Sequence, residues 1–194
     1  MICIINYGGG NVRSVENILK ALEQDYIISN KKGDILSSRK IIFPGQGHFG
    51  QSMTAIKQNG LDKIITKALD KRIPFLGICV GLQVLFECSE EAPDVKGLGI
   101  LKGNIIKYKT QKTPQIGWNK IRTTGNNTIL YDDYYYFVNS FYANPLDKNI
   151  ISSTADYSID FCASIEKENL FATQFHPEKS GKIGRASIEN WINI

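Results

Sequence analysis

The chain has 194 residues, of which 42% are hydrophobic and 22% are charged, and its formal net charge is +4. This composition is typical of a globular protein with a sizeable core, and we expect a single domain over residues 1–194. The lysines and arginines form no dense block, which argues against a nucleic-acid partner, and no apolar run approaches the ~20 residues that span a membrane. The four cysteines have neither metal-ligand spacing nor the density of a disulfide scaffold. We therefore expect no metal site and a reduced, cytoplasmic setting.

The first half of the chain alternates between strand and helix patterns. The predicted strands are Ile2–Asn6, Tyr26–Ser29, Lys40–Phe43 and Phe75–Ile78. The predicted helices are Val12–Glu23, Gln51–Asn59, Leu61–Lys71 and Leu82–Glu87. In the first helix the apolar side chains recur on one face, namely Val15, Ile18, Leu19 and Leu22. The alternation predicts a parallel sheet with helices on both faces.

After Glu90 short strand patterns dominate, and Gly, Pro and Asn turns separate them. The predicted strands are Asn104–Tyr108, Lys120–Thr123, Tyr134–Val138, Ile150–Ser153, Phe161–Glu166 and Leu170–Gln174, and the last helix is Ile183–Ile192. We expect these strands to extend the central sheet and to add antiparallel hairpins. The predicted fold class is therefore α/β, with a central, mostly parallel sheet, flanking helices and added antiparallel strands.

The segment from Gly77 to Gly81 predicts a reactive cysteine. It reads Gly-Ile-Cys-Val-Gly between an apolar strand and a helical run, which is the pattern of a nucleophile elbow with cysteine in place of serine. The turn is so tight that the residues two before and two after the nucleophile must be small, as Gly77 and Gly81 are. Cys79 would then lie at a helix N-terminus, where peptide dipoles favour a thiolate. The alternative is that Cys79 is a small core residue.

A cysteine nucleophile needs a base, and the chain has only two histidines. His176 lies in a Gln-Phe-His-Pro-Glu segment, and its imidazole could take the thiol proton and return it to a leaving amine. Glu178 could hold the ring in the required tautomer, which would complete a Cys-His-Glu triad. The alternative is a turn with a solvated carboxylate. We interpret His48, which follows a glycine-rich loop, as loop packing or surface.

Two glycine-rich loops follow predicted strands. Gly8–Gly10 lacks the G-x-G-x-x-G spacing of a dinucleotide site, so we expect no nucleotide there. Pro44–Gly47 ends a strand that could lie beside the elbow strand. Acyl transfer needs two N–H donors for the developing oxyanion, and we expect one from Val80 and the other from this loop. The alternative is that the loop is an ordinary tight turn.

Several motifs together resemble the class I glutamine amidotransferases over the full length of the chain. They are Asn6–Asn11, Pro44–Gly47, Gly77–Gln83, Gly117–Asn119, Tyr136–Ser140 and Gln174–Ser180. The elbow and the His-Pro-Glu segment occur across that family. The loop after the first strand, the Gly-Trp-Asn segment and the trailing Lys-Ser resemble one branch of it, the glutaminase subunits of imidazole glycerol phosphate synthase in histidine biosynthesis. The resemblance implies the flavodoxin-like amidotransferase fold and no cofactor.

The resemblance also implies a role for each matching residue. Cys79 would be the nucleophile, His176 the acid and base, and Glu178 the group that orients the imidazole. The oxyanion hole would use Val80 and Gln46, and the substrate glutamine would be held by Gly47, Gln83, Ser140 and Phe141. The implied reaction hydrolyses glutamine to glutamate and ammonia through a thioester.

A partner is implied as well, because the ammonia of this family does not escape into solution. It passes to a TIM-barrel cyclase subunit, which makes imidazole glycerol phosphate and an aminoimidazole carboxamide nucleotide (AICAR). No part of this sequence has the pattern of such a barrel, so the resemblance implies a heterodimer with a separate cyclase subunit. Residues that match the partner-facing mouth and ammonia gate are Tyr136, Trp118, Lys179 and Asn11.

The chain departs from the family pattern in three segments. Gln46 stands where the oxyanion loop usually has Val, Asn139 and Phe141 stand where His-Ser-Tyr is usual, and Gln115 stands where a His usually precedes Gly-Trp-Asn. None of these departures removes a triad residue. They keep open a paralogue that supplies ammonia to a sugar amidotransferase in surface-polysaccharide biosynthesis.

Two further alternatives concern the chemistry itself. A stand-alone cysteine hydrolase acting on peptides or γ-glutamyl chains often has His directly after the nucleophile, whereas this chain has Val80. A non-catalytic scaffold would have no need of an intact triad. Both readings are therefore weaker than that of a partner-dependent glutaminase.

Overall fold

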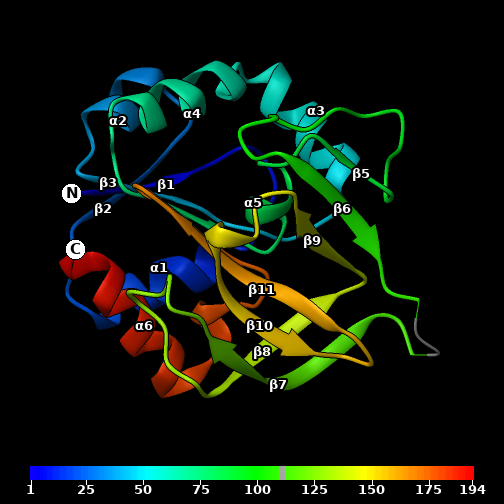
Figure 1. The fold of residues 1–194 in the computed structure, drawn as a ribbon. Coiled ribbons are helices and arrows are strands. Elements are labelled where there is room, and N and C mark those ends of the chain that lie inside the picture. The colour runs from blue at the N-terminus through cyan, green and yellow to red at the C-terminus, as the bar shows by residue number, and fades with distance from the viewer. Residues whose placement is uncertain (110–111) are drawn as a thin grey trace.

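A computed structural model describes residues 1–109 and 112–194 of the chain. The strands are β1 (Ile2–Ile5), β2 (Tyr26–Ser29), β3 (Lys40–Phe43), β4 (Phe75–Ile78), β5 (Cys88–Ser89), β6 (Gly103–Lys107), β7 (Gln115–Thr123), β8 (Tyr134–Asn139), β9 (Phe141–Pro145), β10 (Ile151–Asp156), β11 (Asp160–Lys167) and β12 (Leu170–Thr173). All of these strands join one sheet, whose main path runs β2-β1-β3-β4-β12-β11-β10-β7-β8 (Figure 1). Strands β2, β1, β3, β4 and β12 pair in parallel and the later ones pair mostly antiparallel, as predicted.

Helices cover both faces of the parallel strands. They are α1 (Val12–Ala21), α2 (Lys32–Ser37), α3 (Phe49–Gln58), α4 (Leu61–Asp70), α5 (Val80–Gln83) and α6 (Gly181–Asn193), with short 3-10 helices η1 (Lys148–Ile150) and η2 (Pro177–Lys179). Figure 1 shows α2, α3 and α4 on one side of the sheet and α1 and α6 on the other. None of the helices in the described part of the chain is long and apolar enough to cross a membrane.

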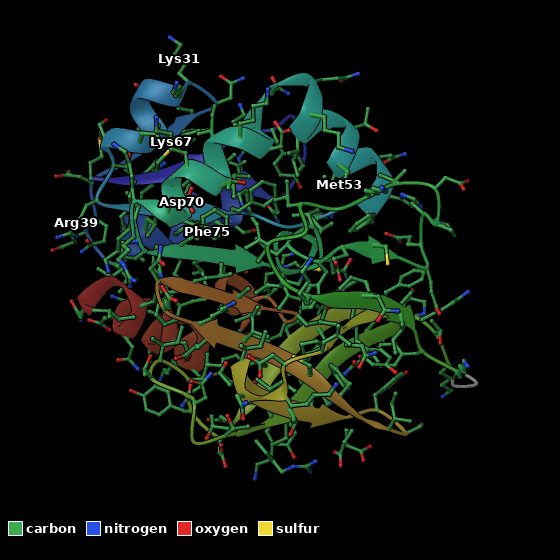
Figure 2. All side chains as sticks on the ribbon, turned by 45° about the horizontal axis from the view of Figure 1, so that its top comes forward. Lys31, Arg39, Met53, Lys67, Asp70 and Phe75 are labelled. Atoms are coloured by element: carbon green, nitrogen blue, oxygen red, sulfur yellow. The ribbon has the colours of Figure 1, made fainter. Side chains whose placement is uncertain are left out.

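The alternation of side chains along β1 explains this two-sided arrangement. Ile2 and Ile4 pack in one core cluster with side chains of α1 and α6, while Cys3 and Ile5 pack in the other with side chains of α2, α3 and α4. Successive strand residues point to opposite faces, so a continuous apolar strand requires a cover on each side. In Figure 2, Phe75 at the start of β4 lies beneath α4, and Lys31 reaches outward from the start of α2.

One predicted helix is wrong and two small elements were not predicted in the first half. The helix expected at Leu82–Glu87 is instead the four-residue α5, which starts at Val80. The chain leaves the helix early because Glu87 pairs with Gly103, both through its N–H and through its carboxylate, and this pairing leads into β5. The six-residue α2 buries only Ile35, so it leaves no apolar periodicity in the sequence.

The antiparallel half also differs from its predicted bounds. The strand expected at Lys120–Thr123 begins at Gln115, as β7. Its first residues invert the usual pattern, because Gln115 is buried whereas Ile116 and Trp118 are exposed. A strand is usually indicated by apolar buried residues that alternate with polar exposed ones. Here the apolar residues are the exposed ones, so the pattern does not indicate a strand. Strand β9 was not predicted either, because it follows β8 after a single residue.

The carboxyl ends of β1, β3, β4 and β12 meet at one edge of the sheet. Strand β3 is paired with β4, which confirms that the loop Pro44–Gly47 lies beside the elbow strand. A Cβ on Gly45 would overlap the carbonyl of Ile78 and would lie 2.7 Å from the N atom of Val80. The loop therefore packs backbone to backbone against the elbow, and only glycine fits at Gly45.

We expect Gly45→Ala to lower the free energy of unfolding by more than about 2 kcal/mol, because the added methyl group would force two backbone segments apart. Gly33→Ala is the matched control. Gly33 is helical and nothing lies within 4 Å of its hypothetical Cβ, so we expect it to be neutral or to stabilise by about 0.5–1 kcal/mol. Urea unfolding of both variants tests this, and equal stability of the two would contradict the packing argument.

Candidate active site

Cys79 has the backbone of a nucleophile elbow. Its φ of +52° and ψ of −107° are strained for a residue with a side chain, and its N–H donates to the carbonyl of Thr173 at 2.7 Å. A Cβ on Gly77 would lie 2.7 Å from the carbonyl oxygen of Gly81, and one on Gly81 would lie 2.7 Å from that of Phe43. The requirement for small residues on both sides of the cysteine is therefore confirmed.

His176 and Glu178 form a buried pair. His176 Nδ1 lies 2.7 Å from Glu178 Oε1, and both side chains are almost fully buried. The segment is fixed to β8, because His176 N–H donates to the Tyr136 carbonyl at 2.9 Å. Ser180 adds a second link, since its Oγ donates to the His176 carbonyl at 2.7 Å and accepts from Tyr136 N–H at 2.9 Å. The pair is held by backbone bonds, which leaves the other ring nitrogen for chemistry.

The surroundings of His176 favour its charged form. Burial by itself lowers the pKa of the imidazole, but hydrogen bonds and charge interactions with Cys79 and Glu178 outweigh it, so the net pKa lies above the ordinary value of 6.5. An imidazolium beside a sulfur atom is the resting state expected of a cysteine nucleophile paired with its base. The structure thus brings the three predicted triad residues together.

The triad opens into a cavity of 290 Å³. Seven further residues that the sequence motifs single out also line it, namely Gln46, Gly47, Gln83, Asn139, Ser140, Phe141 and Lys179. All four predicted glutamine-binding residues are among them. Glu91, Pro114 and Val138 also line the cavity and were not predicted. Glu91 comes from a loop without a family motif, and its carboxylate accepts from Phe49 N–H at 2.6 Å.

Gln174 is a further residue of this site that was not predicted. It is fully buried, and its Nε2 lies 3.6 Å from the Sγ of Cys79. Its Oε1 accepts from Nε2 of Gln83 at 3.1 Å. The signal was present, since Gln174 begins the segment that carries His176, but its side chain could not be placed without the pairing of β12 with β4.

The two predicted oxyanion residues lie on adjoining segments. Val80 is the first residue of α5, so its N–H has no acceptor within that helix. The carbonyl of Gln46 faces the hydroxyl of Tyr7 at 3.5 Å. Because a trans peptide directs its C=O and N–H in opposite directions, the N–H of Gly47 points away from Tyr7. The role of Gln46 in an oxyanion hole stays a prediction.

The predicted gate residues are only partly brought together. The rings of Trp118 and Tyr136 are in edge contact, with centroids 6.0 Å apart, and Lys179 lies in the cavity wall. Asn11 caps α1, because its side chain accepts from Ser14 N–H at 3.2 Å. His48 is exposed and caps α3 by accepting from Gly50 N–H, which agrees with the loop role assigned to it.

Two of the departures from the family pattern face each other. Gln115 and Asn139 are register partners across β7 and β8. The hydroxyl of Tyr108 joins them, donating to Gln115 Oε1 at 3.2 Å and accepting from Asn139 Nδ2 at 3.0 Å. Burial raises the pKa of Tyr108, so the hydroxyl stays protonated. The two changes thus belong to one buried network beside the cavity.

Comparison with known proteins agrees with this geometry. Residues 3–193 match the family described as glutamine amidotransferase class-I. The chain is 43% identical to "Imidazole glycerol phosphate synthase subunit HisH 1" of Methanococcus maripaludis and 45% identical to "Imidazole glycerol phosphate synthase subunit HisH" of Methanocaldococcus jannaschii, with full coverage of each chain.

Solved structures show the same fold at low sequence identity. One described as a glutamine amidotransferase gives a TM-score of 0.80 at 16% identity, covering 100% of this chain and 98% of the other. The PurLQS structure from Thermotoga maritima gives a TM-score of 0.77 at 20% identity, covering 99% of this chain and 97% of the other. The predicted amidotransferase fold is therefore confirmed.

The pKa of His176 predicts how stability depends on pH. Since that pKa is higher in the folded chain than the ordinary value of 6.5, the histidine contributes stability that is complete below 6.5 and is lost as pH rises through the folded value. We therefore expect the free energy of unfolding to decline above about pH 7 in the wild type. His176→Gln should remove that part of the decline, and His48→Gln is the matched control that should keep it. Urea unfolding at a series of pH values from about 6 upward measures the free energy of unfolding of each variant. An equal decline of that free energy with pH in wild type and His176→Gln would contradict the assignment.

Proposed function

This chain belongs to the class-I glutamine amidotransferases, and among them to the HisH subunits of imidazole glycerol phosphate synthase. From that premise we propose that residues 1–194 act as one glutaminase domain, which hydrolyses glutamine to glutamate and ammonia. The observation that carries the proposal is the cysteine held at φ +52° beside the buried His176–Glu178 pair. The strained backbone of Cys79 costs stability, and a strained cysteine beside a charged histidine is the arrangement that covalent catalysis requires.

In the first half of the reaction, the Cys79 thiolate attacks the side-chain amide carbon of glutamine. A C–S bond forms, and the carbonyl electron pair moves to the oxygen, which accepts from the N–H groups of Val80 and Gln46. When the intermediate collapses, the C–N bond breaks and His176 gives its proton to the leaving nitrogen. Ammonia departs and a thioester remains on the sulfur.

In the second half, water replaces ammonia next to His176. The neutral imidazole takes a proton from the water as it attacks the thioester carbon, and the C–S bond then breaks to release glutamate. Glu178 keeps the ring oriented through both halves, because its 2.7 Å hydrogen bond fixes Nδ1 and leaves Nε2 toward the reacting atoms. In this proposal the α-ammonium of glutamine lies near the Glu91 carboxylate in the cavity wall.

The partner in this proposal is a TIM-barrel cyclase, which docks on the outer face of β7 and β8 and takes up the ammonia to make imidazole glycerol phosphate and AICAR. That face is unusual for a sheet exposed to water, because it carries exposed apolar side chains, namely Ile116, Trp118, Tyr134 and Val138. Register pairs place Ile116 opposite Val138 and Trp118 opposite Tyr136, so these side chains form one contiguous patch. Such patches mark protein–protein contacts. Lys179 and Tyr136 would line the route that ammonia takes.

The alternatives have less support. The names of both relatives reported above favour the synthase over a paralogue of polysaccharide biosynthesis. A stand-alone cysteine hydrolase would leave the apolar face of β7 and β8 without a use. A scaffold without catalysis would have no need of the strained backbone of Cys79. A reduced, cytoplasmic setting stays a prediction, which the four free cysteines suit.

Ammonia release from glutamine tests the proposed reaction. In this proposal the loop Pro44–Gly47 rests with the Gln46 N–H turned away from the oxyanion, so we expect the chain alone to be nearly silent. We expect strong stimulation when the cyclase barrel and its nucleotide substrate are both added. Cys79→Ala should abolish ammonia release while still binding the barrel, which makes it the blank. Unchanged turnover by Cys79→Ala would refute the mechanism. High activity of the chain alone would count against control by the partner.

Binding to the barrel tests the proposed interface. We expect Trp118→Ala to weaken the complex by at least ~2 kcal/mol, or about thirtyfold in Kd, because a large ring would be lost from the centre of the patch. Leu146→Ala is the matched control, since Leu146 is 71% exposed, compared with 56% for Trp118, and lies outside the patch. Titration calorimetry measures both constants. Equal loss of affinity in the two variants, or none in either, would place the interface elsewhere.

A further inference from the structure

A buried amide touches the reacting sulfur from inside the protein. Gln174 is fully buried and is absent from the lining of the cavity, yet its Nε2 lies 3.6 Å from Cys79 Sγ. The backbone of Gln174 is fixed because its N–H donates to the carbonyl of Ala163 at 2.8 Å. The sulfur thus interacts with Gln174 as well as with His176, and Gln174 has no role in the predicted triad.

The direction of this amide follows from its neighbours. The carbonyl of Phe141 can only accept, so the end of the Gln83 amide that lies 3.4 Å from it must be the NH₂ group. The same NH₂ group lies 3.1 Å from the Gln174 amide, so the atom of Gln174 facing it must be the acceptor Oε1. Nε2 is then the end of Gln174 that faces the sulfur. The Phe141 carbonyl, which can only accept, thus sets the orientation of both amides and places the NH₂ group of Gln174 against Sγ.

We infer that Gln174 is a hydrogen-bond donor to the Cys79 sulfur that stabilises negative charge there, most of all when the sulfur leaves in hydrolysis of the thioester. This inference rests on the glutaminase reaction proposed above and adds a residue to it. In the thioester the sulfur is neutral and accepts weakly. As the C–S bond breaks, its electron pair goes to sulfur, and the N–H bond from Gln174 strengthens with the developing charge. The proton from the attacking water goes to His176, as before.

The same bond acts differently in the two halves of the reaction. In the resting enzyme it increases the fraction of thiolate, but it also lowers the nucleophilicity of that thiolate, so its net effect on the attack is partly cancelled. In thioester hydrolysis the charge appears on sulfur only as the reaction proceeds, so nothing cancels the effect. Loss of the donor should therefore slow the second half more than the first and should leave thioester on the enzyme.

Gln83 connects this donor to the substrate cavity. Its NH₂ group donates to Gln174 Oε1, and Gln83 also lines the cavity. A hydrogen bond accepted at Oε1 polarises the amide and makes Nε2 the stronger donor. Glutamine bound against Gln83 thus lies at the far end of a two-amide chain that ends on the sulfur.

Two variants separate the donor from its packing. Gln174→Leu keeps the approximate size and removes both polar ends. Gln174→Glu keeps the acceptor for Gln83 and replaces only the donor, with a carboxylate that repels a thiolate. Ser164→Ala is the matched control, because Ser164 is a buried polar residue of the neighbouring strand β11 whose hydroxyl contacts only Ser152 and Ser153 among the described residues.

The first measurement is alkylation by iodoacetamide at pH 7, followed by mass spectrometry of the peptides. Cys88, an exposed thiol outside the cavity, serves as the internal reference. We expect the Cys79 to Cys88 rate ratio to fall about threefold in both Gln174 variants, less than the loss in turnover because a smaller thiolate fraction is partly offset by a more nucleophilic sulfur, and to stay within about 1.5-fold in Ser164→Ala. An unchanged ratio in folded Gln174→Leu and Gln174→Glu would overturn the inference. If Gln174→Leu does not fold by circular dichroism, Gln174→Glu decides.

The second measurement is turnover of glutamine in complex with the cyclase barrel and its nucleotide substrate. We expect kcat to fall about tenfold in Gln174→Leu and KM to fall with it, because slow hydrolysis lets the thioester accumulate. Acid quenching and intact-mass analysis should detect that thioester. A lower kcat with unchanged KM and no trapped thioester would overturn the role in hydrolysis. A wild type that releases no ammonia would count against the proposed function, while the alkylation ratio would still decide whether Gln174 acts on the sulfur.

Discussion

The site depends on close backbone packing around Cys79. Gly45 and Gly81 let β3 and its loop press directly against the elbow, and Gly77 lets the elbow close on itself. The contacts at Gly45 and Gly77 are with backbone atoms, and at Gly81 the carbonyl and the ring of Phe43 lie against the glycine, so the strained φ of Cys79 is held by close packing around it. The sulfur therefore has a position that does not depend on loop flexibility, and the cavity, the base and the proposed Gln174 donor are arranged around it.

The base is held in a different way, by hydrogen bonds to the antiparallel half of the sheet. His176 and Ser180 bind the backbone of Tyr136 in β8, and the ring of Tyr136 contacts Trp118 on the outer face. The proposed partner surface and the histidine proposed as the base thus both depend on Tyr136. A partner that moves β8 would move the main chain that positions the base, which is a short physical connection between binding and chemistry.

The departures from the family pattern are less disruptive than their number implies. Gln115 and Asn139 replace two residues that face each other across β7 and β8, and Tyr108 joins them in one buried network. Such networks are stable when their members change together, because each donor keeps an acceptor. Within this network, Oδ1 of Asn139 has no hydrogen-bond partner among the described residues. Neither change touches the triad.

The sequence by itself determined the chemistry and the outline of the fold, since the glycines around Cys79, the His-Pro-Glu segment and the apolar strands are local patterns with local physical causes. It did not determine where α5 ends, the extent of β7, or which buried amide touches the sulfur. Gln174 meets Cys79 only because β12 pairs with β4, although the two residues lie far apart in the chain. The exposed Trp118 and buried Gln115 contradict the usual pattern because Trp118 lies on the proposed partner face and Gln115 belongs to a buried polar network with Tyr108 and Asn139. Tertiary structure alone decided these features, because each depends on strand pairings that no local stretch of sequence encodes.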